Sequence, residues 1–358
     1  SGITLEALEN SELTYEKKHE LNIGVAFGFV DNRINVEFDW YRRNNFDLIG
    51  FTQTMGVGGV TTKLANDATM QSTGCEFTIS TTNIKTKDFK WTTDWIFGWA
   101  ENTITKLDSR SQVYELVNGF GRTEGRPIGA LYSIPFAGLT EEGLPTFYID
   151  AEHTQIAGPD NYDAIYFQEY ENVDYLKYEG SIDPTITGSF GNTFSWKGLK
   201  LNVFFTYSFG NVLRLDDLCP VYSSDYSDLT ASMKEMKNRW MVPGDEQLTT
   251  IPSIPTVRQM REINALNNAY SAYNYSTERV AKGDFIRLKE LSLAYDLPKK
   301  VFEGQKAVSS FGVKLSATNI WLAYADKKLN GRDPEYYNSG GVSSPVPRQF
   351  TLTVKLGF

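Results

Sequence analysis

The amino-acid sequence predicts an all-β protein whose antiparallel strands form part of the wall of a transmembrane β-barrel. Three observations lead to this prediction. Apolar and polar residues alternate in several segments, short and long connections follow each other in turn, and aromatic residues make up 14% of the 358 residues. Alternation puts apolar side chains on one face of a strand and polar side chains on the other. A barrel wall between lipid and water needs this pattern.

The clearest alternation lies at the end of the chain, in residues 349–358. Every second position is apolar there: Phe350, Leu352, Val354, Leu356 and Phe358. Polar or small residues occupy the positions between them. We predict that these five side chains form membrane-facing wall, in contact with the outer-membrane lipid.

The same kind of alternation predicts about nine strands in all. In order along the chain, they cover residues 15–29, 34–40, 75–79, 90–99, 186–196, 199–209, 291–297, 311–317 and 349–358. Trp91, Trp95 and Trp99 share the apolar face of the fourth strand. They are expected to belong to the wall and to the aromatic girdles at its edges.

The connections between the predicted strands are of two kinds. Short turns lie near residues 31–32, 85–88, 197–198 and 298–310, and long segments cover about 48–70, 108–183, 211–283 and 324–346. Short and long connections alternate strictly, so all long segments belong to one end of the sheet. This is typical of outer-membrane barrels, which have tight periplasmic turns and long external loops. Within the long segments, helical spacing predicts helices over 228–240 and 257–269.

The number of strands has a consequence for closure. About nine strands would leave two open edges in lipid, where unpaired backbone groups are not tolerated. We therefore expect residues 1–358 to be the C-terminal part of one barrel domain, which strands outside this chain complete. If the long segments are external, the first strand runs toward the periplasm, and residues 1–14 belong to an external loop.

Composition excludes several other classes. The net charge of −9 argues against a nucleic-acid partner. No stretch approaches the roughly 18 apolar residues of a membrane helix, so any membrane contact must use strands. Ser223, Ser224 and Asp225 lack the flanking glycines of a nucleophile elbow. We find no catalytic constellation, and we expect neither enzyme activity nor a cofactor.

An acidic run in residues 141–183 is the only candidate for a metal site. Asp160, Asp163 and Asp174 are the candidate ligands, because oxygen-rich clusters can bind Ca²⁺. The alternative is a solvated acidic loop, which is the commoner role of such a run. The spacing of the acids fits no EF-hand loop.

Three tyrosines are candidates for ligand contact. Tyr270, Tyr273 and Tyr275 lie in a predicted external loop, before the strand that begins near Asp284. Aromatic rings offer flat faces to sugar rings and apolar side chains. The alternative is that the same rings pack against neighbouring loops or against another part of the protein.

A series of short motifs runs through almost the whole chain. In order, they are Asp31-Asn32-Arg33-Ile34, Asp39-Trp40-Tyr41-Arg42-Arg43, Gly125-Arg126-Pro127-Ile128-Gly129, Asp284-Phe285-Ile286-Arg287-Leu288-Lys289, Tyr295-Asp296-Leu297-Pro298, Thr318-Asn319-Ile320 and Asp333-Pro334-Glu335. Their order and spacing resemble those of the SusC/RagA-like TonB-dependent transporters of Bacteroidetes.

The resemblance implies the C-terminal part of a barrel of about 22 strands, a size class with a plugged lumen. It implies that the plug lies upstream, in the N-terminal remainder of the same barrel. It also implies a SusD-like surface lipoprotein as a lid, the TonB system as the energy source, and the outer membrane of a Gram-negative bacterium as the location. The cargo would be an oligosaccharide or an oligopeptide.

Two alternatives remain open at this stage. An outer-membrane porin or barrel enzyme would close its barrel with this chain alone. A soluble β-sandwich binding module would bury the apolar faces of its strands against each other and would carry long loops at both ends.

Overall fold

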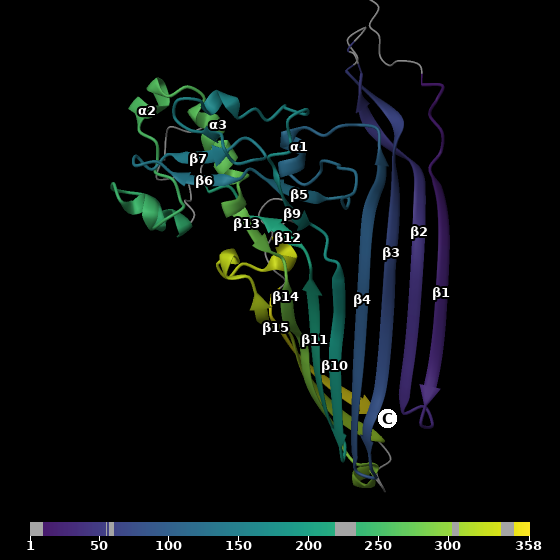
Figure 1. Ribbon diagram of the computed structural model, residues 1–358. Helices are drawn as coiled ribbons and strands as arrows, with labels where there is room; N and C mark the ends of the chain where they lie inside the picture. The colour runs from purple at the N-terminus through teal and green to yellow at the C-terminus, as the bar shows by residue number, and fades with distance from the viewer. Residues whose placement is uncertain (1–9, 55, 57–60, 219–233, 303–307, 338–346) are drawn as a thin grey trace, which may run out of the picture.

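The structure is a computed structural model that describes residues 10–54, 56, 61–218, 234–302, 308–337 and 347–358. Its main element is a nine-stranded antiparallel sheet with the order β1-β2-β3-β4-β10-β11-β14-β15-β16. These strands are β1 Lys17–Phe29, β2 Ile34–Gln53, β3 Thr62–Lys85, β4 Phe89–Leu107, β10 Ile186–Trp196, β11 Leu199–Phe209, β14 Phe285–Asp296, β15 Ser310–Ala325 and β16 Gln349–Gly357. The sheet confirms the strands predicted from alternation. In Figure 1 the short turns lie at the bottom and the long segments at the top.

One face of the sheet is apolar across most of its width. A single row of paired residues contains, in order, Trp91, Phe194, Leu201, Leu293, Leu315 and Leu352. Among them, Leu293, Leu315 and Leu352 are 46%, 53% and 67% exposed. A continuous exposed apolar face needs an apolar environment such as lipid.

The opposite face is polar and charged. Lys90 pairs with Ser195, Ser195 with Lys200, and Lys200 with Ala294, which pairs with Lys314. A cavity of about 410 Å³ lies on this face and includes Lys200, Lys314 and Lys355 in its wall. Charged groups are not buried without partners. This face is therefore suited to water or to a polar partner.

Strands β2 and β3 are longer than the alternation predicts. They contain 20 and 24 residues, respectively, so most of the expected segment 48–70 is strand and only residues 54–61 connect the two. The prediction of a long loop over about 48–70 was therefore wrong, because the connection is much shorter than expected. Past Trp40 the polar run 42–45 interrupts the alternation, while the backbone pairing of β2 with β3 continues.

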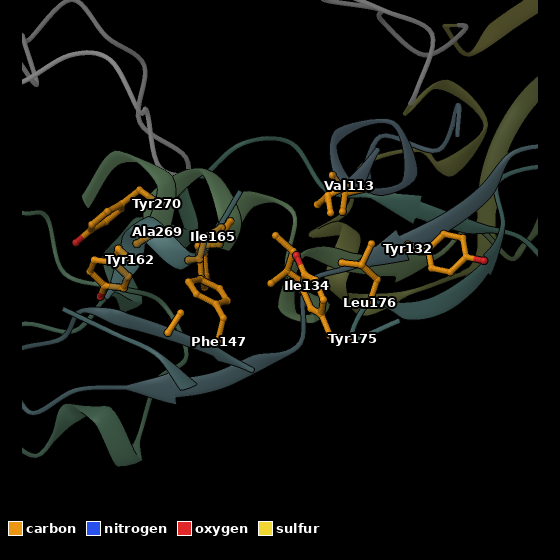
Figure 2. Packing of buried hydrophobic residues seen from close by; sticks show 14 of the residues in the cluster. Val113, Tyr132, Ile134, Phe147, Tyr162, Ile165, Tyr175, Leu176, Ala269 and Tyr270 are labelled. Atoms are coloured by element: carbon orange, nitrogen blue, oxygen red, sulfur yellow. The ribbon is translucent and has the colours of Figure 1, made fainter. Parts of the chain in front are cut away.

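Residues 108–183, 211–218 and 234–283 fold together at the end of the sheet opposite the short turns, and we call this unit the loop assembly. Its elements are α1 Val113–Val117, β5 Ala130–Ser133, β6 Phe136–Leu139, β7 Pro145–Tyr148, β8 Ile156–Ala157, η2 Tyr162–Ala164, β9 Lys177–Ser181, β12 Val212–Arg214, η3 Lys234–Asn238, η4 Asp245–Gln247, α2 Val257–Glu262, α3 Leu266–Asn274, η5 Thr277–Arg279 and β13 Val280–Lys282. All three ranges contribute to one apolar core. Figure 2 shows part of it, with Phe147, Ile165 and Ala269 close together.

The predicted helices in these segments differ from the observed ones. The expected helix 257–269 is two helices, α2 and α3, separated at Ala265, whose φ of 54° is left-handed. The expected helix 228–240 lies partly outside the described residues, and its described part contains the 3₁₀ turn η3. Ser223, Ser224 and Asp225 also lie outside the described residues.

The last long segment folds back onto the sheet. Its described part contains η7 Lys327–Leu329 and η8 Pro334–Tyr336, and a further turn, η6 Lys299–Phe302, lies at the opposite end. Arg287 on β14 donates a 2.5 Å hydrogen bond to Asp333. Leu329 packs with Leu213 and other residues of the loop assembly. This segment therefore ties the assembly to the wall.

These observations decide between the alternative folds. In the described chain the apolar face is not covered by a second sheet, and the long segments share one end, which contradicts a β-sandwich. Strands β1 and β16 are the two edges of the sheet, so the described chain does not close a barrel alone. No described helix is both long enough and apolar enough to cross a membrane.

Candidate functional site

A cleft lies where the ends of β2, β3 and β4 meet the loop assembly, and we call it the loop cleft. It consists of two hollows of about 470 Å³ and 350 Å³. They share walls formed by Ser109, Arg110, Ser111, Arg122 and Tyr170. Volumes of this size are typical of sites for small ligands.

A carboxylate and a guanidinium form one wall of the larger hollow. Asp67 on β3 is 2% exposed, and its Oδ2 accepts a 2.8 Å hydrogen bond from the Ser109 hydroxyl. Arg122 Nη1 lies 3.7 Å from the same oxygen. Asp67 Oδ1 has no hydrogen-bond partner in the described chain. The carboxylate thus keeps one free acceptor atom.

Backbone contacts hold these two side chains in place. The carbonyl of Asp67 accepts a 2.9 Å bond from the Asp108 amide, and the Arg122 amide donates to Ser111 Oγ at 2.8 Å. A Cβ on Gly50 would lie 2.8 Å from Arg122 Nη1 and 3.2 Å from Asp67 Oδ2. A side chain at this position would therefore require the Arg122 guanidinium to shift.

Exposed aromatic rings line the same cleft. Phe51 is 74% exposed, Phe120 62% and Tyr170 44%. The turn that follows Tyr170 is held by Glu169, whose Oε1 accepts backbone N–H bonds from Tyr170, Glu171 and Asn172. These bonds, led by the one from Glu171, lower the pKa of Glu169. A ligand in the cleft would meet flat apolar faces beside a charged pair.

A buried arginine holds the loop assembly together behind the cleft. Arg214 on β12 donates to the carbonyls of Val117, Tyr132 and Ser276 and to the Ser133 hydroxyl, at 2.5–3.1 Å. Burial lowers the pKa of Arg214 to about 10. The guanidinium therefore remains charged at neutral pH, and it joins three separate stretches of the chain.

The three tyrosines predicted from sequence lie in the loop assembly, away from the walls of the loop cleft. Tyr270 and Tyr273 are 4% and 1% exposed and belong to its apolar core, and the Tyr270 hydroxyl donates to the Ser253 carbonyl at 2.7 Å. Tyr275 is half-buried against the same core. Figure 2 shows Tyr270 beside Tyr162. Their contact with a ligand stays a prediction, but core packing already accounts for two of them.

The structure does not bring the three candidate metal ligands together. Asp160, Asp163 and Asp174 are all exposed. Across the described ranges, no three His, Cys, Asp or Glu side chains lie close enough to hold a metal ion. The acidic run instead contributes negative charge to the surface of the loop assembly.

The predicted wall residues lie where alternation places them. Phe350, Leu352, Val354 and Leu356 pair with Ala317, Leu315, Val313 and Phe311 on β15. All five predicted side chains are more than half exposed. Their contact with lipid stays a prediction.

Sequence patterns did not indicate the loop cleft. Asp67, Arg122 and Tyr170 come from three segments far apart in the chain, and none of them belongs to a recognisable ligand motif. The only local signal is the run of serines and charges in 108–111, which on its own is typical of a solvated turn.

In comparisons with known proteins, the chain is similar to TonB-dependent receptors. No protein-family model matches it. TonB-dependent receptor P3 of Formosa agariphila is 26% identical over 385 residues, which is 100% of this chain and 36% of the relative. TonB-dependent receptor SusC of Bacteroides thetaiotaomicron is 34% identical over 99 residues, covering 27% of this chain and 10% of SusC. The chain thus spans about a third of the length of the first of these relatives.

Solved structures share the fold of this chain. The RagAB peptide transporter matches with a TM-score of 0.73 and 24% identity, over 99% of this chain and 36% of the matched chain. The RagAB peptide importer in its closed-closed state matches with a TM-score of 0.72 and 26% identity, over 99% and 37%. Both similarities cover the sheet and the loop assembly together.

Proposed function

Because this chain belongs to the SusC-like family of TonB-dependent transporters, of which it covers only a part, we propose that it forms a section of the wall and the external loops of an active outer-membrane importer. The observation that carries the proposal is the continuous exposed apolar face of the nine-stranded sheet, with the long segments at one end. A wall of this kind fits a membrane with the loop assembly outside.

The polar face supports the same orientation. In an importer it would line the lumen, where Lys90, Lys200 and Asp94 would meet water or a polar plug. The open edges β1 and β16 would then pair with strands from the remainder of the barrel, because unpaired strand edges are not tolerated in lipid. The wall would thereby close around the lumen.

The cargo would be an oligosaccharide or an oligopeptide captured at the external end. The loop cleft supports this step, because it combines aromatic faces with hydrogen-bonding groups, and both classes of oligomer use such contacts. The RagAB structures, described as a peptide transporter and importer, favour the peptide class. Import would proceed by gating, without covalent chemistry.

Two partners belong to this proposal. A SusD-like surface lipoprotein would cover the loop assembly as a lid, and TonB would supply energy from the inner membrane. The assembly offers exposed apolar side chains for such a contact: Met241, Val242 and Leu248 lie in one turn, and Leu248 is 83% exposed. The amides of Met241 and Val242 donate to Asp245 Oδ2, which keeps that turn compact.

The test is energy-dependent uptake by cells that carry the intact protein. Labelled mixtures of short peptides and of short oligosaccharides are supplied separately, before and after collapse of the proton-motive force. We expect one mixture to accumulate, and we expect collapse to abolish accumulation while surface binding persists. Uptake that continues after collapse would show passive diffusion, and the proposal would fail.

A further inference from the structure

The loop cleft contains a carboxylate oxygen that the described chain leaves without a donor. Asp67 is almost fully buried, and only its Oδ2 has partners, Ser109 at 2.8 Å and Arg122 at 3.7 Å. Oδ1 has none. A buried carboxylate oxygen without a donor is unfavourable. It points to a donor that comes from outside the described residues.

Arg122 is poorly placed to supply this second bond. Two hydrogen bonds join its main chain to Ser111. The Arg122 amide donates to Ser111 Oγ, and the Ser111 hydroxyl donates to the Arg122 carbonyl. Its guanidinium approaches the carboxylate on the Oδ2 side. Oδ1 therefore has no donor in the described chain while the ion pair persists, and Asp67 lines the larger hollow of the cleft.

The charge of the cleft favours a cationic donor. Its two hollows are lined by five acidic side chains, Asp67, Asp108, Glu115, Glu124 and Glu171, against two basic ones, Arg110 and Arg122. The acidic run 141–183 belongs to the same assembly. A surface of one sign raises the local concentration of ligands of the opposite sign.

The aromatic rings favour the same ligand. The exposed rings of Phe51, Phe120 and Tyr170 line the hollow to which Asp67 contributes. Aromatic faces attract ammonium and guanidinium groups and also pack against flat or apolar surfaces. A carboxylate next to such rings is suited to a cation with an apolar stem or ring.

We propose that the loop cleft binds a primary ammonium or guanidinium group carried next to an apolar or flat surface, with Asp67 Oδ1 accepting its N–H. This inference rests on the import function proposed above and names the chemical class of cargo that the cleft admits. Two sources share this chemistry, a peptide with basic side chains and an oligomer of amino sugars. Asp67 anchors the cation, and the aromatic rings hold the adjoining surface.

The test measures binding to the intact protein purified in detergent. The probes are a labelled tri-lysine peptide and a labelled trimer of glucosamine, each with a counterpart in which every amino group is acetylated, and which therefore carries no cation, as a matched control. We expect at least one cationic probe to bind, and to bind at least about tenfold more tightly than its acetylated form. The probe that binds identifies the source.

Asp67→Asn keeps the shape of the side chain and removes its charge. We expect it to weaken binding of the cationic probe by about tenfold or more and to leave the acetylated probe unchanged. Asp163→Asn, an exposed acid outside the cleft walls, is the control and should change neither. If Asp67→Asn does not fold, Tyr170→Ala at an exposed position decides, with several-fold weaker binding of the cationic probe expected.

Three results would overturn the inference. They are equal binding of charged and acetylated probes, no binding of either cationic probe to the unaltered protein, and full binding by the folded Asp67→Asn or Tyr170→Ala variant. Binding and import are measured separately. Cation binding without energy-dependent uptake would refute only the import proposal, and uptake without cation binding would refute only this inference.

Discussion

At the scale of single residues, the loop assembly depends on a small number of buried polar groups. Arg214 is the clearest, because one guanidinium satisfies carbonyls from α1, β5 and the turn before β13. Charged hydrogen bonds of this kind are stronger than neutral ones, and their loss leaves carbonyls buried without donors. Loss of this side chain would therefore leave several carbonyls of the assembly without a donor at once.

We predict that Arg214→Ala destabilises the loop assembly by about 3 kcal/mol or more, because several buried acceptors lose their donor at once. The matched control is Arg258→Ala. Arg258 pairs with Glu262 at i,i+4, and its side chain is 82% exposed, so its loss should cost at most about 0.5 kcal/mol. Limited proteolysis of the assembly measures both variants, and equal resistance in the two would refute the role of Arg214.

Buried tyrosines predict how the assembly responds to alkaline pH. Burial raises the pKa of Tyr175 from 10.0 to about 12 and also raises the pKa of Tyr162. The unfolded chain then loses these protons before the folded chain does. The contribution of the protonated, buried tyrosine to the unfolding free energy is complete below pH 10, and it is lost as the pH rises through about 12.

We therefore expect proteolytic resistance of the assembly to fall between pH 10 and 12, with tyrosinate absorbance appearing over the same interval. Tyr175→Phe should make the fall smaller, because it removes one of the titrating groups. A titration in which buried tyrosines ionise at pH 10 without loss of structure would contradict this expectation.

At the scale of elements, the two faces of each wall strand are expected to meet different environments, lipid on one side and the lumen on the other. Thr351 and Leu352 are neighbours in β16 and point to opposite faces, and both are exposed. A charged side chain on a lipid-facing position costs about 2–4 kcal/mol near the middle of the bilayer, whereas a lumen-facing position tolerates it.

We predict that Leu352→Arg lowers the yield of folded protein in the membrane and its unfolding free energy by about 2 kcal/mol, and that Thr351→Arg changes the latter by less than about 0.5 kcal/mol. Denaturant unfolding in lipid vesicles measures both. If the two variants behave alike, the faces of β16 do not have the environments assigned to them.

The sequence could predict local patterns within a strand but not contacts between distant residues. The wall was predictable because alternation is local, and each strand such as β16 reveals its faces within a few residues. The upper halves of β2 and β3 were not predictable, because the alternation is interrupted there, by the polar run 42–45 in β2 and by Asn66 and Asp67 in β3, while the backbone pairing continues. The loop assembly was not, because its contacts join distant residues, as when Arg214 reaches Val117 across 97 positions.

At the scale of the whole molecule, the sheet, the loop assembly and the returning segment form one arrangement with two distinct ends. Arg287 on β14 pairs with Asp333 and Glu335, so the wall and the last long segment are joined directly. The loop cleft lies where β2 and β3 meet the loop assembly. A lid or cargo that engages this end would therefore contact elements anchored to the wall.

The central claim is that the apolar face of the sheet meets lipid while the opposite face meets water. The most direct test places a spin label at each position of 350–357 in the intact protein, reconstituted in lipid, and measures access of oxygen and of a water-soluble nickel chelate. We expect oxygen access to be high at Phe350, Leu352, Val354 and Leu356, and chelate access to be high at the positions between them. Apolar positions shielded from both reagents, or no alternation at all, would contradict a membrane wall.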